Sequence, residues 1–483
     1  MFTFPDAVDR NKHQIMPLAY LLAVATLIFV LFSGWGYDDP YITYRYAHNL
    51  IKGEGFVYNS GEQILSTTTP LFTLLLAIIG SLWQDIPRMA NLIGALSIAA
   101  GALFLWDLAH TWETPLVGWT ALLLYPTFPL LLATIGSETP LYIALILGCF
   151  AAYARRGYNW AAAFAALTVL ARPDGLLVPI LLGMHYLLIE RRPIPWRAVI
   201  IFVSLVLPWL VFSSFYFGSP IPATLATKQH QGSMAISQRF VRGFLTILKP
   251  YSQGWNYWVE ACLGLVGLGW VALQARRWLL FLAWGGAYII SYALLGVSRY
   301  FWYYAPFVPV IVVLAGLGVS TLISLIGRIH PRYSGRIPTL VLFMLLVVPL
   351  VPGQVQWAGQ IPVQTSRQDI YRAVGYWLDA NLPRDASVGT LEVGTIGYYA
   401  HRRMVDFAGL IQPEVAMHLN EGTTYDDAAL YAAVKFRPDY LVLQEGYFPK
   451  LDQDFVSPNC QAVATYAGDQ YGYPANLNVY RCR

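Results

Sequence analysis

Long apolar segments separated by short polar turns dominate the first 352 residues of the chain. The segment 15–36 is long enough to cross a bilayer, which takes about 20 residues of helix. No small-residue cleavage site follows it, so we interpret it as an anchor and not as a signal peptide. The same pattern predicts further spans at about 68–84, 89–109, 115–136, 139–154, 158–171, 175–189, 198–217, 256–273, 278–296, 301–326 and 338–352.

Basic residues cluster in turns between these spans. The clusters are Arg155-Arg156, Glu190-Arg191-Arg192 with Arg197, Arg276-Arg277, and Arg328 with Arg332 and Arg336. Basic loops tend to remain cytoplasmic, so these turns are expected inside. The polar loops 37–67 and 218–255, the turn 172–175 and all residues after 352 are then expected outside.

The number of spans conflicts with this orientation. Twelve spans with a cytoplasmic N-terminus would place the C-terminus inside. We place the discrepancy between residues 85 and 157, where 115–136 contains Pro126 and Pro129 and is interpreted as a pair of half-helices. The prediction is therefore 11–13 transmembrane helices and a C-terminus outside.

After residue 352 the pattern becomes that of a water-soluble α/β domain. Residues 371–381 have helical apolar spacing, and 388–391 and 440–443 are typical of short buried strands. Charge follows the same division, since residues 353–483 hold 24 of the 58 charged residues. The predicted fold class is an all-α polytopic membrane domain, residues 1–352, followed by an extracytoplasmic α/β domain, residues 353–483.

The composition supports a membrane protein. Apolar residues make up 57% of the chain and charged residues 12%, about half the usual charged share of a soluble domain. This excludes a disordered protein, a nucleic-acid-binding module and an ordinary cytosolic enzyme. Four cysteines are present, and no spacing among them indicates a metal site. Cys460 and Cys482 form a disulfide if the tail faces an oxidising compartment, or remain two free thiols.

Two adjacent carboxylates, Asp38 and Asp39, stand where the first span leaves the membrane. Pro40 follows them, so a helix is predicted to begin here, with the carboxylates near its N-terminus. A helix cap is the structural interpretation. The aromatic-rich amphipathic segment that follows favours an interfacial element with a function, since ionisable groups at membrane depth are usually functional.

The same loop carries a family resemblance. Asp38-Asp39-Pro40-Tyr41, Gly53-Glu54-Gly55, Gly61-Glu62 and Thr67-Thr68-Thr69-Pro70 resemble the first outer loop of GT-C fold integral-membrane glycosyltransferases. The similar group depends on polyprenyl-phosphate sugars and includes terminal arabinofuranosyltransferases and mannosyltransferase relatives. Further similar motifs are Gly136-Ser137-Glu138-Thr139-Pro140, Arg172-Pro173-Asp174-Gly175, Pro222-Ala223-Thr224 through Lys228, Ser298-Arg299-Tyr300 and, in the tail, Gly394-Thr395-Ile396-Gly397 and Val405-Asp406.

The resemblance implies inverting transfer of a sugar from a polyprenyl phosphate to a hydroxyl of a glycan, lipid or protein outside the cell. One carboxylate takes the acceptor proton, and Asp38 or Asp39 is the candidate, with Asp38 favoured. Cations stabilise the leaving phosphate, and the candidates are Lys228, Arg299 and Arg172. Candidates for contacts with the sugar or the acceptor are Glu138, Asp174 and Arg45.

Several alternatives stay open on the sequence alone. Arg299 could be an interfacial anchor, Arg172 and Asp174 a local salt bridge, and Lys228 a solvated loop residue. Asp406 is interpreted as a structural carboxylate that binds loop amides. The stretch Leu65-Ser66-Thr67 and the tripeptide Pro222-Ala223-Thr224 depart from the family pattern, which leaves the donor sugar undefined.

Cofactor and function are also open in part. No cofactor is certain, although carboxylates such as Asp38 and Asp39 suit Mg²⁺ or Mn²⁺. No Gly-rich phosphate loop is present, which disfavours a nucleotide-sugar donor. The leading hypothesis is a glycosyltransferase of a bacterial plasma membrane. A secondary transporter or flippase is the alternative, because buried ionisable residues suit it as well. A degenerate binding protein is a third possibility.

Overall fold

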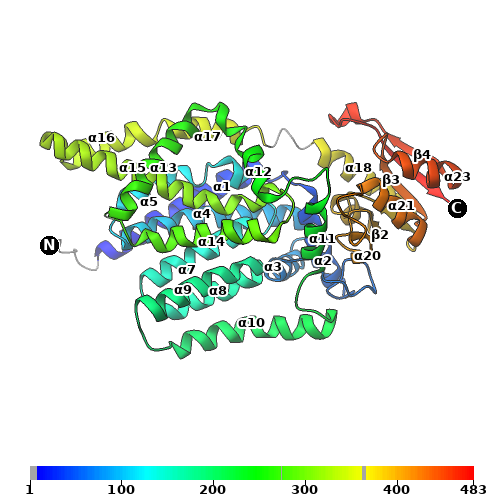
Figure 1. Ribbon diagram of the computed structural model, residues 1–483, viewed down its shortest axis with the longest axis horizontal. Coiled ribbons are helices and arrows are strands. Elements are labelled where there is room, and N and C mark those ends of the chain that lie inside the picture. Colours follow the sequence, from blue (N-terminus) through cyan, green and yellow to red (C-terminus); the bar gives the residue numbers. More distant parts are fainter. Residues whose placement is uncertain (1–7, 274, 362–365) are drawn as a thin grey trace.

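The computed structural model describes residues 8–273, 275–361 and 366–483 and consists of a helical layer with a smaller sheet domain at one end (Figure 1). Five helical stretches are long and apolar enough to cross a membrane: Ile86–Thr111, Trp196–Phe217, Trp278–Leu295, Phe301–Ile329 and Arg336–Ala358. Shorter apolar helices lie among them. The protein is therefore a multi-pass membrane protein, as its hydropathy predicts.

The predicted spans map closely onto helices. The helical passes are α1 (Val8–Phe32), α4 (Ile86–Thr111), α5 (Pro115–Leu124) with α6 (Pro129–Leu132), α7 (Thr139–Ala154), α8 (Tyr158–Ala171), α9 (Leu177–Met184), α10 (Trp196–Phe217), α13 (Trp255–Leu273), α14 (Trp278–Leu295), α15 (Val308–Ile329), and α16 (Arg336–Val347) with α17 (Leu350–Ala358). The stretch 115–136 is broken as predicted, because Pro126 and Pro129 interrupt it.

The predicted span 68–84 corresponds to a short helix. Helix α3 (Pro70–Gly80) has 11 residues, about 16 Å of helix, against about 30 Å of hydrocarbon core. Both of its ends lie on the side of the sheet domain, since Gly80 packs against Ile51 and Ile86. Helix α3 therefore belongs with the shorter apolar helices, among which α5 and α9 have a similar length. The number of membrane crossings and the discrepancy that we place between residues 85 and 157 stay predictions.

Besides α3, three helices lie between these passes. Helix α2 (Asp38–Ile51) follows α1, and α11 (Ala223–Ser233) and α12 (Phe240–Leu248) lie in the segment between α10 and α13. Two ion pairs lie near helix ends: Asp107 of α4 pairs with Arg155, and Glu113 pairs with Arg277. The basic turns thus gather at the opposite end of the helical layer from α2, α11 and the sheet (Figure 1).

The tail holds a five-stranded sheet in the order β2-β1-β3-β5-β4. The strands are β1 (Ser387–Thr390), β2 (Arg403–Asp406), β3 (Tyr440–Gln444), β4 (Cys460–Tyr466) and β5 (Leu477–Cys482). Strands β2, β1 and β3 are parallel, whereas β5 is antiparallel to β3 and to β4. Cys460 and Cys482 face each other across β4 and β5 and form a disulfide, which decides between the two alternatives.

Helices cover this sheet and join it to the membrane part. They include α18 (Ser366–Asn381), α19 (Thr395–Ala400), α20 (Pro413–Ala416) and α21 (Tyr425–Phe436). The α/β prediction is confirmed, with α18, β1 and β3 on the predicted segments. Membrane helix α17 continues to Ala358, past the predicted end at 352. Asp406 accepts hydrogen bonds from the backbone amides of Ala408 and Ile411, which confirms its structural interpretation.

Candidate functional site

A cavity of about 350 Å³ lies where the helical layer meets the tail domain. Its walls come from segments far apart in sequence. Most of them are ends of helices and loops rather than helix centres. The lining residues are Asp39, Pro40, Ile42, Thr43, Ser66, Thr67, Thr68, Thr69, Glu138, Arg172, Pro173, Asp174, Pro220, Ile221, Pro222, Thr224, Leu225, Lys228, Tyr292, Leu295, Val297, Trp302, Tyr303 and Leu410.

The start of α2 sends the two adjacent aspartates to different partners. Tyr37 is extended, with φ of −145°, and the helix begins at Asp38. Successive helix residues point about 100° apart, so the two carboxylates cannot face the same way. Asp38 accepts hydrogen bonds from the backbone amides of Gly394 (2.9 Å) and Thr395 (2.7 Å) in the tail. Asp39 lines the cavity instead.

Asp39 forms an ion pair with Lys228 of α11. The Lys228 ammonium lies 3.7 Å from the Asp39 carboxylate, whose side chain keeps 35% of its surface exposed. The ammonium also faces the rings of Tyr300, Trp302 and Tyr303 at 5.2–5.6 Å. Burial lowers the pKa of Lys228, but the charge of Asp39 and the neighbours Tyr303 and Glu138 outweigh it, so the net shift is upward. Lys228 therefore remains a cation inside the cavity.

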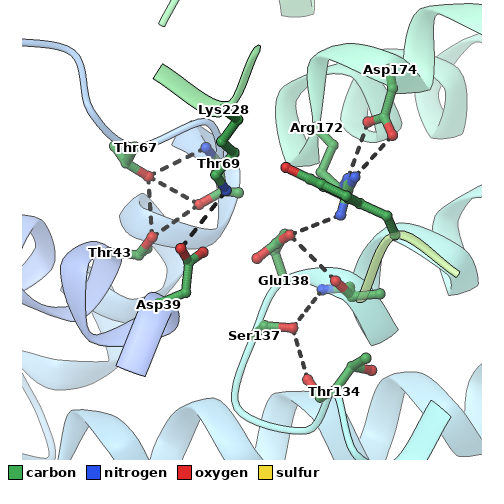
Figure 2. A network of polar contacts seen from close by, with 12 residues as sticks. Asp39, Thr43, Thr67, Thr69, Thr134, Ser137, Glu138, Arg172, Asp174 and Lys228 are labelled. Carbon is green, nitrogen blue, oxygen red and sulfur yellow. Dashed lines mark hydrogen bonds and ion pairs between the residues drawn. The ribbon is translucent and has the colours of Figure 1, made fainter. Parts of the chain in front are cut away.

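Hydroxyl groups line the same wall (Figure 2). The Thr43, Thr67 and Thr69 hydroxyls lie within 3.1–3.4 Å of one another. Two further lining hydroxyls, of Ser66 and Thr224, are buried and have no hydrogen-bond partner among the described residues. An unpaired buried hydroxyl is unfavourable, so both groups favour a polar ligand in this cavity.

The opposite wall is built around Arg172. Its guanidinium donates to both carboxylate oxygens of Asp174, at 3.1 and 3.0 Å, and to Glu138 at 3.2 Å. It also donates to the hydroxyl of Tyr292 at 2.6 Å, and that hydroxyl donates to Asp174 at 2.7 Å. The Arg172 side chain is only 5% exposed. Figure 2 shows this cluster facing Asp39, Lys228 and the threonines.

Glu138 reaches this cluster through the broken helix. After α6 the chain turns at Gly136, whose φ of 93° suits glycine, and α7 begins at Thr139. Burial raises the pKa of the Glu138 carboxyl, and the charge of Arg172 opposes that rise. The wall thus presents two carboxylates that a buried arginine holds in place.

Some predicted site residues lie outside the cavity. Arg45 is buried and donates to the backbone carbonyls of Tyr58 (2.9 Å), Gly397 (2.6 Å) and Arg402, so it ties the loop after α2 to the tail. Arg299 donates to the Gln238 side chain at 2.9 Å. Neither residue, nor Asp38, is among the lining residues. The structure therefore does not bring Asp38, Arg45 and Arg299 to this cavity.

Several lining residues were not predicted from the sequence. The run Thr67-Thr68-Thr69 was recognised only as part of a motif that resembles the family, beside a stretch that departs from the family pattern. Its role as a polar wall of the cavity was not predicted. No feature of the sequence indicates a role in the site for Tyr292, Trp302 and Tyr303, because aromatic residues are common in apolar segments. Leu410 of the tail also lines the cavity, and no spacing relates it to the membrane helices.

The residues present give little support to a resident metal ion. No group of three or more His, Cys, Asp or Glu suited to a metal occurs in the part of the chain that the structure describes. The carboxylates of the cavity contact protein cations, since Asp39 meets Lys228 while Glu138 and Asp174 meet Arg172.

Comparison with known proteins gives two partial sequence matches. A family model described as a domain of unknown function (DUF8728) matches residues 359–480. A terminal β-(1→2)-arabinofuranosyltransferase of Mycobacterium tuberculosis is 27% identical over 286 residues. That match covers 52% of this chain and 44% of the relative, so it spans less than half of the relative's length.

Solved structures match over nearly the whole chain. The apo structure of ArnT from Cupriavidus metallidurans gives a TM-score of 0.63 at 13% identity and covers 97% of this chain and 98% of that one. ArnT bound to undecaprenyl phosphate gives 0.61 at 14%, covering 96% and 97%. The oligosaccharyltransferase of Archaeoglobus fulgidus, tethered to an acceptor peptide, gives 0.57 at 13%, covering 89% and 69%. The chain therefore has the GT-C fold, as its motifs predict.

Proposed function

We propose that this chain, which has the GT-C fold of membrane glycosyltransferases, is an inverting glycosyltransferase that uses a polyprenyl-phosphate sugar. The observation that carries the proposal is the pairing of a partly exposed carboxylate, Asp39, with a buried cation, Lys228, in a cavity beside the tail domain. The activity of the arabinofuranosyltransferase relative and the undecaprenyl phosphate bound to ArnT support the donor class.

Each wall of the cavity has a part in the reaction. The acceptor oxygen attacks the anomeric carbon, the bond from that carbon to the phosphate oxygen breaks, and the phosphate leaves with the bonding electrons. Asp39 accepts the proton of the acceptor hydroxyl. Lys228 binds the phosphate and stabilises its negative charge. Arg172 orients Glu138 and Asp174, which accept hydrogen bonds from sugar hydroxyls.

The same geometry favours Asp39 over Asp38 as the base. Both oxygens of Asp38 are hydrogen-bonded to tail amides, whereas the Asp39 carboxylate borders the cavity. Burial raises the pKa of Asp38 to about 6, although the amides of Thr395 and Gly394 oppose the rise. Asp38 therefore serves to dock the tail.

The orientation in the membrane follows from the basic turns. Arg155, Arg191, Arg277 and Arg328 lie at helix ends remote from the tail, which the positive-inside rule assigns to the cytoplasm. The cavity and the tail would then be extracytoplasmic, in a bacterial plasma membrane. Lipid-linked sugars suit that side, because nucleotide sugars are scarce there. No observation favours the transporter alternative, since the ionisable cluster lies at one end of the helical layer.

The test is sugar transfer by the purified protein in lipid nanodiscs, over a panel of polyprenyl-phosphate sugars. Asp39→Asn is expected to lower turnover by about 10²–10⁴-fold, the usual contribution of a general base, while donor binding persists. Asp38→Asn is the matched control and is expected to keep most of the turnover of the folded protein. Full turnover by Asp39→Asn would refute the role of Asp39. If a substrate crosses the liposome membrane and no transfer product forms, the proposed glycosyltransferase activity is refuted.

A further inference from the structure

A second cavity, of about 310 Å³, lies inside the tail domain. It opens beyond the carboxyl ends of the parallel strands β1 and β3. Thr390, the last residue of β1, and Glu392 line one side, and Gln444, the last residue of β3, and Tyr447 line the other. Its volume is near the lower end of the range for small-ligand sites, about 300–1,000 Å³.

The topology of the sheet makes this a favourable place for a ligand. From β1 the chain passes through α19 to β2 on one side, and later returns to β3 on the other side of β1. Connections that leave β1 and β3 in opposite directions open a crevice between the carboxyl ends of these two strands. Ligands of open α/β sheets bind at such a switch point.

The lining of the cavity suits an uncharged polyhydroxylated ligand. Its described residues include no Lys, Arg or His, and Glu392 is present, so an anion such as a phosphate is disfavoured. The Tyr473 hydroxyl donates to Gln444 at 3.0 Å and lies 3.0 Å from the Tyr371 hydroxyl, which forms a polar chain along one wall. Tyr447, 43% exposed, offers an aromatic face beside these hydrogen-bonding groups.

The loop that follows β1 runs from the second cavity to the junction at Asp38. Glu392 lines the tail cavity, and the Gly394 amide, two residues later, donates to Asp38. Tyr371, whose hydroxyl lies 3.0 Å from that of Tyr473, lines the cavity as well. Burial raises the pKa of its phenol, and the charge of Glu392 adds to the rise.

We propose that the crevice between the carboxyl ends of β1 and β3 binds a neutral sugar residue of a glycan acceptor, one or more units away from the hydroxyl that reacts at Asp39. This inference rests on the proposed function. It makes the tail a specificity element that holds the acceptor chain while its end enters the membrane cavity. Gln444, Thr390 and Glu392 form hydrogen bonds to hydroxyls, and the ring of Tyr447 stacks on the sugar.

The test is saturation-transfer NMR on the full-length protein in nanodiscs. The probes are neutral methyl glycosides and disaccharides of arabinose, mannose and glucose, with glucose 6-phosphate as an anionic probe. Tyr447→Ala and Gln444→Ala are expected to weaken the best neutral probe about tenfold. Tyr376→Ala is the matched control, since Tyr376 is 56% exposed on the same domain and lies outside the cavity. Cleavage of the lipid-linked donor without acceptor is measured on the same samples and is expected to be unchanged in all three.

Three results would overturn the inference: no saturable binding of any neutral probe, binding unaffected by both cavity variants, or tighter binding of the phosphorylated probe. A misfolded tail would lose saccharide binding for a reason unrelated to the cavity, so two variants are used and the Tm of each shows whether it folds. If only one variant folds, its binding alone decides, and unchanged binding counts as the second of these results. Donor cleavage separates the two proposals. Saccharide binding without any donor cleavage or transfer supports the tail site and refutes the glycosyltransferase.

Discussion

The segment 38–69 contributes to two regions that look alike in sequence and differ in what their polar groups do. At the junction with the tail, Asp38, Arg45 and Asn59 bind backbone amides and carbonyls of the tail. In the cavity, Asp39 has one ion pair at 3.7 Å, and the hydroxyls of Ser66 and Thr224 have no partner among the described residues. Polar groups satisfied by backbone hold the protein together, whereas incompletely satisfied ones are suited to a ligand.

Arg45 gives the largest test of the junction. Arg45→Ala would remove hydrogen bonds to three buried carbonyls, and each hydrogen bond to a charged group is worth about 1.5–3 kcal/mol. We expect the free energy of unfolding of the tail to fall by at least about 3 kcal/mol, measured by thermal unfolding in detergent. Donor binding in the cavity should persist at temperatures where the variant remains folded. An unchanged Tm would show that the junction is not structural.

The charge of Asp38 gives a pH-dependent test of the same junction. Burial raises its pKa to about 6, so the folded state binds this proton more tightly than the unfolded chain does. Its contribution to stability therefore falls as pH rises from about 4 to about 6. Asp38→Asn does not titrate, so the difference in Tm between wild type and variant should shrink over that interval. His48 and His401, which have lowered pKa values, titrate in both proteins and cancel. A constant difference would contradict the prediction.

Lys228 tests the cavity. Lys228→Gln would remove the cation that faces Asp39, and a hydrogen bond to a charged group is worth about 1.5–3 kcal/mol. The Kd for a polyprenyl-phosphate sugar is expected to rise about 10–100-fold. Arg239→Gln is a matched control, because Arg239 belongs to the same outer segment and does not line the cavity. Equal loss in both variants would indicate a general charge effect and not a phosphate contact.

Substitution of Thr224 is expected to have the smallest effect on stability. It also separates the effect on stability from the effect on ligand binding. The buried hydroxyl of Thr224 has no partner in the part of the chain that the structure describes, so Thr224→Val should change the free energy of unfolding by less than about 1 kcal/mol. The affinity for donor or acceptor should nevertheless fall severalfold, measured as a change in KM at constant kcat. Thr67→Val, which breaks contacts with Thr43 and Thr69, should lower stability as well. Identical behaviour of the two variants would remove the distinction between satisfied and unsatisfied hydroxyls.

The sequence by itself determined the membrane character, the broken span after α5, the α/β tail and several residues of the cavity. These features depend on local hydropathy, on proline and on motifs that remain legible along the chain. Asp39, Glu138, Arg172, Asp174 and Lys228 were identified in this way, and all five line one cavity.

Only the tertiary structure decided which of the two adjacent aspartates, Asp38 or Asp39, faces the cavity. A rotation of about 100° per helical residue separates Asp38 from Asp39, and the sequence does not record where the tail docks. Arg45 could be assigned to the junction only once its three carbonyl partners were known, two of them in the tail. The segment 68–84 was predicted as a span from its hydropathy, and only the structure shows that its helix, α3, has 11 residues. The crevice between β1 and β3 likewise depends on strand order, which long-range packing sets and local sequence does not.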